Sequence, residues 1–366
     1  MIVSVHGKEV SITNSKYLIK SINITRFRGL KSLSINDFSR VNVFVGTNNS
    51  GKTSLLEAIR LISSPKDLGK MVLLALQRAR ANPEQKKKNL VNYLLSFFHQ
   101  SMDEDNQKVY SIDFSATINN HQYSYDADAS VGEAVNSAGE LRQVVDIAIG
   151  ISTDNKKMVY TTDRIVNGTE YNFIGKETPL FQVLYVYSTV NVYRTCVSCL
   201  TDYIFREGKK DILTVLQSFD PFVEDISIVG EDVYLYNSKS GSMPLFTYGA
   251  GLQKAVLLTA ILVSCRNGVV LIDEIDDAIH VSAFEEVFAW FLDACVKNNV
   301  QAFITTHSIE ALDAIIRKAH ELYPTNDLLR IITLRKDDFN NITRCKVRSG
   351  EEAYSDRTQF RMELRI

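Results

Sequence analysis

The segment that most constrains this chain is GTNNSGKT at residues 46–53, which matches the pattern G-x-x-x-x-G-K-[ST] at every fixed position. The apolar run at 41–45 predicts a buried strand before it, and SLLEAI at 54–59 predicts the first turns of a helix after it. A glycine-rich turn between strand and helix directs backbone N–H groups and the positive end of the helix dipole toward an anion. We therefore expect an α/β sheet that carries a phosphate-binding loop.

Each residue type in this loop has an expected part in binding a nucleoside triphosphate. The Lys52 ammonium can reach the β- and γ-phosphates, and the Thr53 hydroxyl can ligate Mg²⁺. A plain glycine turn is the alternative, and the flanking strand and helix make it the weaker one. ATP and Mg²⁺ are therefore the predicted ligands. The residues predicted to contact nucleotide are Gly46, Asn48, Asn49, Ser50, Gly51, Lys52, Thr53 and Ser54.

The composition argues against several other classes of protein. A length of 366 residues allows about two domains, and 45% hydrophobic residues are enough for large cores. A formal net charge of -2 argues against a generally basic chain, so that any contact with DNA requires a local patch. Five cysteines without an apolar leader favour reduced thiols in the cytoplasm. No apolar run approaches the roughly 18 residues of a membrane span.

Two further strands are predicted to end in chemically useful side chains. The apolar run at 269–272 leads to Asp273, which would hold Mg²⁺ through water, and to Glu274, which would deprotonate the attacking water. The run at 301–306 leads to His307, which would face the ligand crevice of a parallel sheet and could bind the γ-phosphate. Acids and a histidine at exposed strand ends are the alternative, which is weaker beside an intact phosphate loop.

A second glycine-rich segment, YGAGLQK at residues 248–254, is predicted to open a helix. Gly249 and Gly251 would leave backbone N–H groups free to meet an anion, and Lys254 would add a positive charge. A simple glycine-rich start of a helix is the alternative for this segment.

In the rest of the chain the predicted secondary structure changes from one region to the next. Residues from about 109 to 187 alternate in short runs, which predicts an antiparallel sheet whose last strand is 181–187. The C-terminal third alternates helices and strands, which is typical of a parallel sheet. Helices are predicted at 51–63, 67–80, 89–98, 189–218, 251–264, 281–297 and 308–320. Other strands are predicted at 18–28, 32–36, 225–229, 232–236, 269–272, 301–305 and 328–334.

The four motifs, in this order, resemble the head of the ABC-type ATPases. Within that class the chain is most similar to the OLD (overcoming lysogenization defect) and SMC-like group of AAA ATPases, clearly over about 18–60 and 245–335. The resemblance implies an ABC-type P-loop head, with a mixed sheet, flanking helices, an antiparallel β subdomain and a helical insert. It divides the single split head, 1–366, into a P-loop part at 18–60, an insert at 61–245 and a signature lobe at 246–366. The matching text is INITRFRGLK at 22–31, NVFVG at 42–46, LIDEID at 271–276 with His280, and TTHS at 305–308.

The resemblance also implies partners and further site residues. Two heads would form a homodimer or higher oligomer around ATP, with Gly249–Lys254 of one head facing the phosphate loop of the other. Asp276 or Asp277 would lie in the linking loop at the interface. Arg28 would lie near the nucleotide. Gln100 would be the metal-contacting glutamine of the Q-loop, although an ordinary surface glutamine is the stronger alternative at that position.

Two departures from the family pattern carry expectations of their own. The usual signature serine is absent and Gly249 takes its place, which predicts a weaker γ-phosphate contact and slow hydrolysis. The sequence reaches Ile366 without the length of a Toprim nuclease domain, so we expect the ATPase head alone.

Three functions fit these expectations. The first is an ATPase that senses a trigger and regulates a separate effector, a nuclease or toxin, in anti-phage defence. The second is a DNA-repair ATPase similar to RecF that binds DNA when ATP is bound. The third is a nucleotide-locked scaffold with negligible turnover, and the presence of Glu274 argues against it because a water-activating acid is needed only for hydrolysis.

Overall fold

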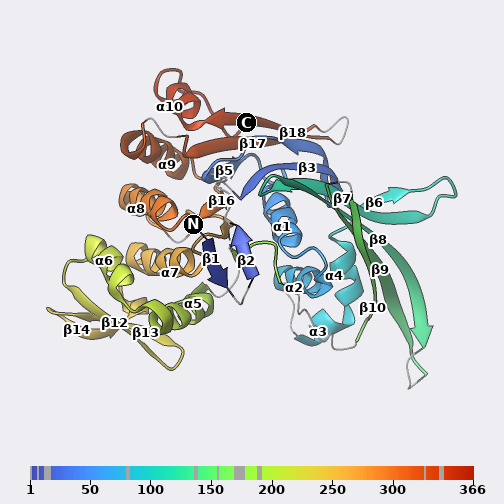
Figure 1. Cartoon of the computed structure of the whole chain (residues 1–366), viewed down its shortest axis with the longest axis horizontal. Coiled ribbons are helices and arrows are strands. Elements are labelled where there is room, and N and C mark those ends of the chain that lie inside the picture. Colours follow the sequence, from blue (N-terminus) through green and yellow to red (C-terminus); the bar gives the residue numbers. More distant parts are fainter. Residues whose placement is uncertain are drawn as a thin grey trace.

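The protein is described by a computed structural model, in which a central sheet lies between two groups of elements (Figure 1). None of the helices in the described part of the chain is long and apolar enough to cross a membrane. The last residue of the predicted helix 67–80 and the first residues of the predicted helix 189–218 lie outside the described residues. The described residues are 2–5, 8–11, 18–79, 83–135, 139–154, 156–168, 178–187, 192–277, 279–324, 327–337 and 342–366.

The central sheet has six strands in the order β11-β15-β16-β5-β17-β18. Neighbours from β11 to β17 pair in parallel, and β18 is antiparallel to β17. The phosphate-loop strand β5 therefore lies in the interior of the sheet, between β16 and β17. These strands are β5 (Val41–Val45), β11 (Val183–Val186), β15 (Val269–Ile272), β16 (Gln301–Thr305), β17 (Leu329–Asp337) and β18 (Ile342–Ser349).

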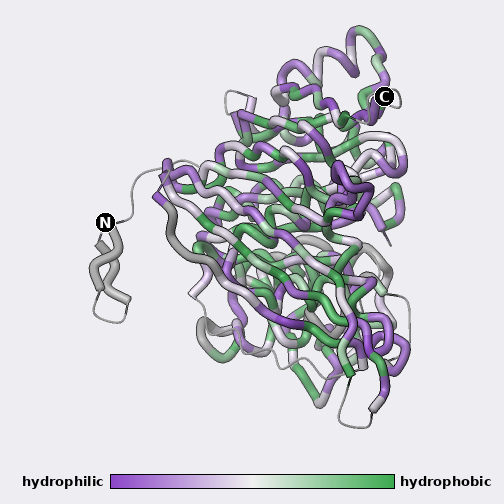
Figure 2. The backbone as a smooth tube through the Cα atoms, turned by 90° about the vertical axis from the view of Figure 1, so that its right-hand side faces the viewer, coloured by the Kyte–Doolittle hydropathy of each residue, from purple (hydrophilic) through white to green (hydrophobic). Residues whose placement is uncertain are grey.

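Both faces of this sheet are covered over its inner strands, so β5, β15 and β16 are buried at every position. Successive side chains alternate between two cores. Val43 and Ile304 belong to the core on one face, and Phe44 and Phe303, stacked with ring centroids 6.1 Å apart, belong to the core on the other. Figure 2 shows the hydrophobic stretches gathered in the interior, with hydrophilic ones along the outer loops.

Helices cover both faces. The first face is covered by α5 (Val192–Glu207), α6 (Lys210–Phe219), α7 (Ala250–Ser264), α8 (Phe284–Lys297), α9 (Ile309–Leu322) and α10 (Gly350–Thr358). The second face is covered by α1 (Lys52–Ile62), α2 (Leu68–Arg78) and α4 (Leu90–Leu95), with α3 (Pro83–Lys88) between α2 and α4. The segments that carry the phosphate loop and the signature thus lead into helices on opposite faces of the sheet.

An antiparallel sheet packs against the second core and confirms the prediction for most of residues 109–187. Its order is β10-β9-β8-β7-β3-β4, and β6 also pairs with β7. Its strands are β3 (Ile19–Phe27), β4 (Leu30–Ile35), β6 (His99–Met102), β7 (Lys108–Ile118), β8 (His121–Val135), β9 (Leu141–Thr153) and β10 (Lys156–Val166). Two small antiparallel sheets join β1 (Ile2–Val5) to β2 (Lys8–Ser11), and β12 (Val223–Val229) to β13 (Asp232–Asn237) and β14 (Gly241–Pro244). Two 3-10 turns are η1 (Leu245–Thr247) and η2 (Val281–Ala283).

The predicted α/β head with a mixed sheet, flanking helices and an antiparallel subdomain is confirmed, and three local predictions are wrong. The strand predicted to end the antiparallel series is β11, which instead pairs in parallel with β15 in the central sheet. The predicted helix 189–218 is two helices, because Gly208 adopts a left-handed φ of 86° after α5 and ends it. The predicted helix 89–98 ends at Leu95, and β6 begins at His99. The division of the head at residues 60 and 245 stays a prediction.

Candidate nucleotide-binding site

The phosphate loop leaves β5 at Gly46 and enters α1 at Lys52. Three of its residues have positive φ angles: Gly46 (148°), Asn49 (65°) and Gly51 (98°). A Cβ atom on Gly46 would lie 2.3 Å from the carbonyl oxygen of Leu334, and one on Gly51 would lie 2.3 Å from the Leu30 side chain. Glycine is required at both positions, because any side chain would combine backbone strain with a steric clash.

Lys52 and Ser50 place polar groups inside the loop. The Lys52 Nζ donates hydrogen bonds to the carbonyl oxygens of Gly46 (2.8 Å) and Thr47 (3.0 Å), and the residue is only 5% exposed. Burial lowers the Lys52 pKa, while the nearby Asp273 and Glu274 carboxylates act to raise it. The Ser50 hydroxyl is buried and has no hydrogen-bond partner among the described residues. A phosphate oxygen would satisfy both groups, so the loop fits its predicted ligand.

The two predicted magnesium ligands from distant parts of the chain lie in direct contact. The Thr53 Oγ1 donates to Asp273 Oδ2 at 2.9 Å, and Thr305 Oγ1 donates to Asp273 Oδ1 at 2.7 Å. A hydroxyl and a carboxylate are the oxygen ligands that Mg²⁺ prefers. The described residues contain no group of three or more His, Cys, Asp or Glu side chains that could hold a metal ion. A Mg²⁺ held by Thr53 and Asp273 would take waters and phosphate oxygens as its remaining ligands.

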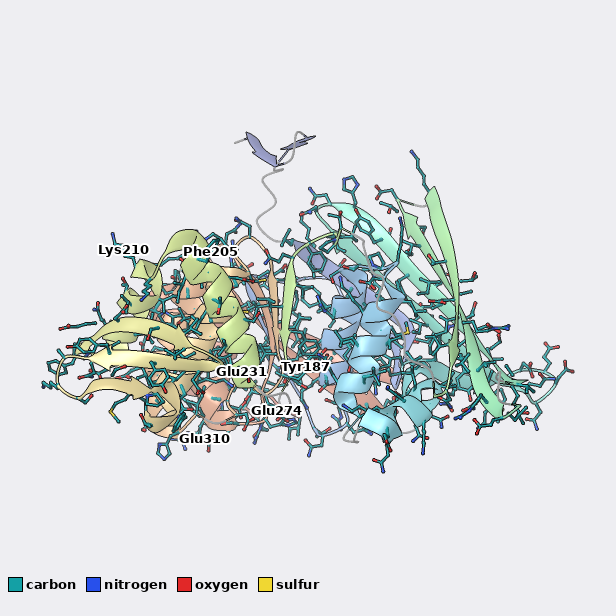
Figure 3. The ribbon with its side chains drawn as sticks, turned by 90° about the horizontal axis from the view of Figure 1, so that it is seen from below. Tyr187, Phe205, Lys210, Glu231, Glu274 and Glu310 are labelled. Atoms are coloured by element: carbon teal, nitrogen blue, oxygen red, sulfur yellow. The ribbon has the colours of Figure 1, made fainter. Side chains whose placement is uncertain are left out.

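Glu274 and His307 lie together at the ends of β15 and β16. The Glu274 backbone adopts a left-handed φ of 54°, and its N–H donates to Thr305 Oγ1 at 2.8 Å. The His307 Nε2 lies 3.8 Å from Glu274 Oε1, and the two side chains are 40% and 42% exposed. Tyr187 follows β11, whose last residue Val186 pairs with Ile272, two positions before Glu274; both Tyr187 and Glu274 are labelled in Figure 3. A strained backbone that exposes an acid beside a histidine is typical of a catalytic site.

Arg28 and Gln100 lie at a pocket of about 420 Å³ beside the phosphate loop. The Arg28 Nη1 lies 2.9 Å from Glu57 Oε2 on α1, and its guanidinium lies 4.6 Å from the centroid of the Phe97 ring. Glu57 is fully buried, so this pair fixes the β3–β4 turn against the phosphate-loop helix. Gln100 is exposed on β6 and lines the same pocket. Its metal-binding role stays a prediction.

The signature segment begins α7, with Gly249 as its N-cap at a φ of -59°. Among the described residues, no atom outside Gly249 and its two chain neighbours lies within 4 Å of a Cβ built on Gly249. The Lys254 Nζ donates to the Asp277 carbonyl oxygen at 3.1 Å, and burial lowers its pKa. The Asp276 Oδ1 is buried without a hydrogen-bond partner among the described residues. Gly251 lies in the first turn of α7, so these residues form one surface of signature and linking loop.

Sequence reasoning missed two residues of the site. Thr305 binds Asp273 and the Glu274 backbone at once, and it precedes His307 by two residues at the end of a buried strand. Glu57 is a fully buried acid in an otherwise apolar helix stripe. A buried charge in an apolar stripe is a signal for a partner, and Arg28 is that partner.

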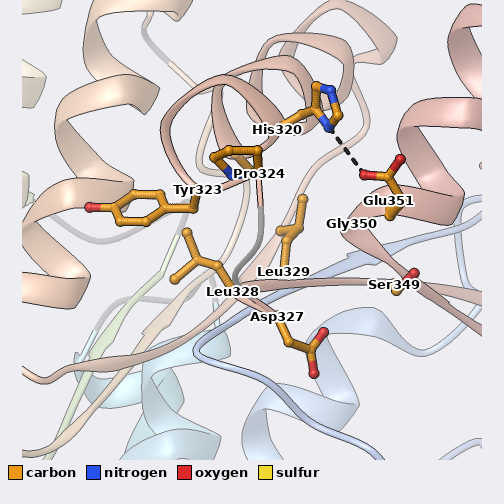
Figure 4. A pocket seen from close by; sticks show the side chains of 10 residues that line it. His320, Tyr323, Pro324, Asp327, Leu328, Leu329, Ser349, Gly350 and Glu351 are labelled. Carbon is orange, nitrogen blue, oxygen red and sulfur yellow. Dashed lines mark ion pairs between the residues drawn. The ribbon is translucent and has the colours of Figure 1, made fainter.

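A separate pocket lies between the end of α9 and the start of α10 (Figure 4). His320 faces Glu351 across it, with Nδ1 3.2 Å from the carboxylate, and stacks on Tyr354. None of the predicted nucleotide-site residues lines this pocket.

The sequence matches two domain families. One, described as "AAA ATPase domain", covers residues 18–195, and the other, described as "AAA domain, putative AbiEii toxin, Type IV TA system", covers residues 199–313. A relative from Helicobacter pylori named ATP/GTP phosphatase is 22% identical over 359 residues, which are 88% of this chain and 93% of the relative. The DNA replication and repair protein RecF of Acinetobacter baylyi is 44% identical over 46 residues, 13% of each chain.

A solved structure has the same fold. It is an SMC head bound to the C-winged helix domain of ScpA, with 12% identity and a TM-score of 0.50, over 92% of this chain and 99% of that chain.

Proposed function

We propose that this chain, an SMC-like ABC-type AAA ATPase and hence an ATP-hydrolysing enzyme, closes as a homodimer around ATP and thereby regulates a separate effector protein. The observation that carries the proposal is the chain of contacts from Thr53 through Asp273 and Thr305 to Glu274. It ties the phosphate loop to the acid predicted to activate water. Nucleotide held by the loop would therefore lie beside the group that hydrolyses it.

Each side chain of the site has one task in this proposal. Lys52 holds the β- and γ-phosphates, and bound Mg²⁺ would neutralise phosphate charge, held by Thr53 and, through water, by Asp273. Glu274 accepts a proton from the attacking water. His307 donates a hydrogen bond to the γ-phosphate, and its position 3.8 Å from Glu274 supports this role. Arg28 and Gln100 would contact the nucleotide and its metal from the neighbouring pocket.

The dimer is supported by where the signature lies. The helix α7 that carries Gly249, Gly251 and Lys254 is on the opposite face of the central sheet from α1, which carries the phosphate loop. A second copy would bring its signature to this copy's phosphate loop, and the buried Asp276 oxygen would gain a partner at such an interface.

The regulated effector would be a nuclease or toxin, and the proposed setting is an anti-phage defence pair of the OLD type in the cytoplasm. The description of the family matched by residues 199–313 names a toxin of a type IV TA system, which supports a place in conflicts of this kind. ATP binding would close the dimer, and hydrolysis would reset it.

A DNA-repair ATPase similar to RecF is the second candidate. It is favoured by the 44% identity over 46 residues to a protein named for DNA replication and repair. In that case the closed dimer would bind DNA in place of an effector protein.

A Glu274→Gln variant tests the proposal, because it keeps the ligands of ATP and removes the base. With ATP and Mg²⁺ its mass in solution is expected to double from the monomer's 41.3 kDa, and with ADP it is not. Glu286→Gln, which changes an exposed acid on α8, is the matched control and should hydrolyse ATP normally.

The same variant, purified from its native cells with ATP, identifies the partner. A stoichiometric nuclease or toxin would support the effector function. DNA alone, lost when Lys52→Ala is added, would support the RecF-like candidate instead. A Glu274→Gln protein that stays monomeric with ATP would rule out the proposed closure.

A further inference from the structure

The C-terminal segment, residues 359–366, returns to the central sheet near the nucleotide site. Leu364 is fully buried in the core on the α7 face of the sheet, and its carbonyl oxygen accepts a hydrogen bond from Thr333 Oγ1 on β17 at 2.6 Å. The segment is therefore packed into the fold at Leu364, rather than lying loose on the surface.

The next residue reaches the histidine of the site. The Arg365 Nη1 donates to the backbone carbonyl oxygen of His307 at 2.8 Å. His307 lies between the end of β16 and the N-cap of α9, Ser308, whose own carbonyl accepts the first helical hydrogen bond, from Leu312. The His307 carbonyl thus lies outside the α9 ladder, and Arg365 supplies its donor.

A carboxylate holds the guanidinium in place. Arg365 Nε and Nη2 lie 2.8 Å and 2.9 Å from the two carboxylate oxygens of Glu363. The Arg365 guanidinium lowers the Glu363 pKa to about 2, so the pair is ionised at any physiological pH. Such a bidentate pair fixes the plane of the guanidinium as well as its position.

The same segment is tied to α9 at a second place. Arg357 on α10 binds both carboxylate oxygens of Asp313 on α9, at 2.6 Å and 2.8 Å. Its Nη1 also donates to the carbonyl oxygen of Met362 at 2.6 Å. The segment is therefore connected to the start of α9 at two places, through the His307 carbonyl and, by way of Arg357, through Asp313.

We propose that Arg365 is a positioning residue for ATP hydrolysis, which holds the His307 backbone so that the imidazole meets the γ-phosphate. The His307 ring is 40% exposed, so packing does little to orient it and the direction of its backbone matters. The inference depends on the proposed role of His307. A small displacement of a group that contacts the reacting phosphate costs rate more than it costs binding.

Steady-state ATP hydrolysis by Arg365→Ala, His307→Ala and the double variant tests this. Arg365→Ala should lower kcat about tenfold with KM within about twofold, and Arg365→Lys should recover part of the rate. The double variant should be no slower than His307→Ala, because both changes remove one function. Arg361→Ala, which removes an exposed arginine of the same segment, should keep the normal rate.

The His307 ring resonance in nucleotide-free protein gives a second readout. The chain has only 6 histidines, so this signal is assigned by its loss in His307→Ala, and it should shift in Arg365→Ala. If His307→Ala hydrolyses ATP slowly but Arg365→Ala does so at the normal rate, the proposed role of Arg365 is wrong while that of His307 stands. The same holds if the rate losses of the two single variants multiply in the double variant. A normal rate for His307→Ala would overturn the role of His307 and this inference together.

Discussion

The two glycine-rich loops of this protein differ in their backbone strain and in how closely the chain encloses them. The phosphate loop is bound within its own chain, with left-handed φ angles at Gly46 and Gly51 and with Thr53 bonded to Asp273. The signature at Gly249 has ordinary backbone angles and open space around its Cβ position, and Lys254 of the same segment donates a hydrogen bond to the linking loop.

The difference indicates what each loop is built to meet. A strained, enclosed loop is shaped in advance for one small ligand, and its conformation is maintained by the surrounding core. An unstrained, open loop places no such demand on the chain, and in the proposed dimer it would face a second copy. We therefore expect substitutions in the first loop to act within one protomer, and substitutions in the second to act across the interface.

The largest effect should come from Lys52→Ala. It removes the buried ammonium that the loop directs at the phosphates, so ATP should bind at least about 100-fold more weakly. Calorimetric titration with ATP and Mg²⁺ measures this, with Lys20→Ala on the exposed side of β3 as the control. Tight ATP binding by Lys52→Ala would mean that the phosphate loop is not the ATP-binding loop.

Mixing two inactive variants tests whether the signature of one copy acts on the phosphate loop of another. Gly249→Asp places a negative charge in open space where it would repel the γ-phosphate of the partner's ATP, and Lys52→Ala disables the phosphate loop. If the loops act across a dimer, an equal mixture forms one intact composite site in each mixed dimer and should recover about a quarter of the wild-type rate. A mixture as inactive as its components would mean that both loops serve the same protomer.

The same two positions should differ in their effect on folding. Gly46→Ala brings a methyl group against the Leu334 carbonyl at a positive φ, and should lower the free energy of unfolding by about 2–4 kcal/mol. Gly249→Ala should change it by less than about 0.5 kcal/mol. Thermal unfolding should show a Tm lower by about 3–5 °C for the first variant only, and equal Tm values would contradict the contrast in strain.

The smallest expected effect is an increase in the rate of ATP hydrolysis. Gly249→Ser supplies the hydroxyl that the family pattern has at this position, and the open space admits it without a clash. One added hydrogen bond of about 1 kcal/mol in the transition state would raise kcat about fivefold. Gly251→Ser, two residues further along the chain, is the control and should not raise the rate.

The sequence predicted the parts of the site that depend on local pattern. The phosphate loop and the strand that ends at Asp273 are contiguous motifs, so their residue types alone indicate a turn, a helix start and exposed acids. The structure then brings Thr53 and Asp273 within 2.9 Å, although they are 220 positions apart. The parallel sheet that does this was expected from the alternation of helices and strands in the C-terminal third.

Pairing partners and returning segments could not be predicted in this way. The alternation in β11 indicates which side chains are buried but carries no information on its neighbour, which is β15. Arg365 reaches the His307 carbonyl through a tertiary contact across 58 positions. Its position in the sequence, beside Glu363, resembles an ordinary surface ion pair, which contributes little to stability.

The interior place of β5 has a consequence for synthesis. Its pairing partners, β16 and β17, begin at residues 301 and 329, so the ribosome makes most of the chain before the phosphate-loop strand can enter its sheet. At roughly 5–20 residues per second this delay is on the order of 10–50 s, during which the four apolar residues of β5 have no strand to pair with. The motif that is translated among the first is therefore among the last to become competent to bind nucleotide.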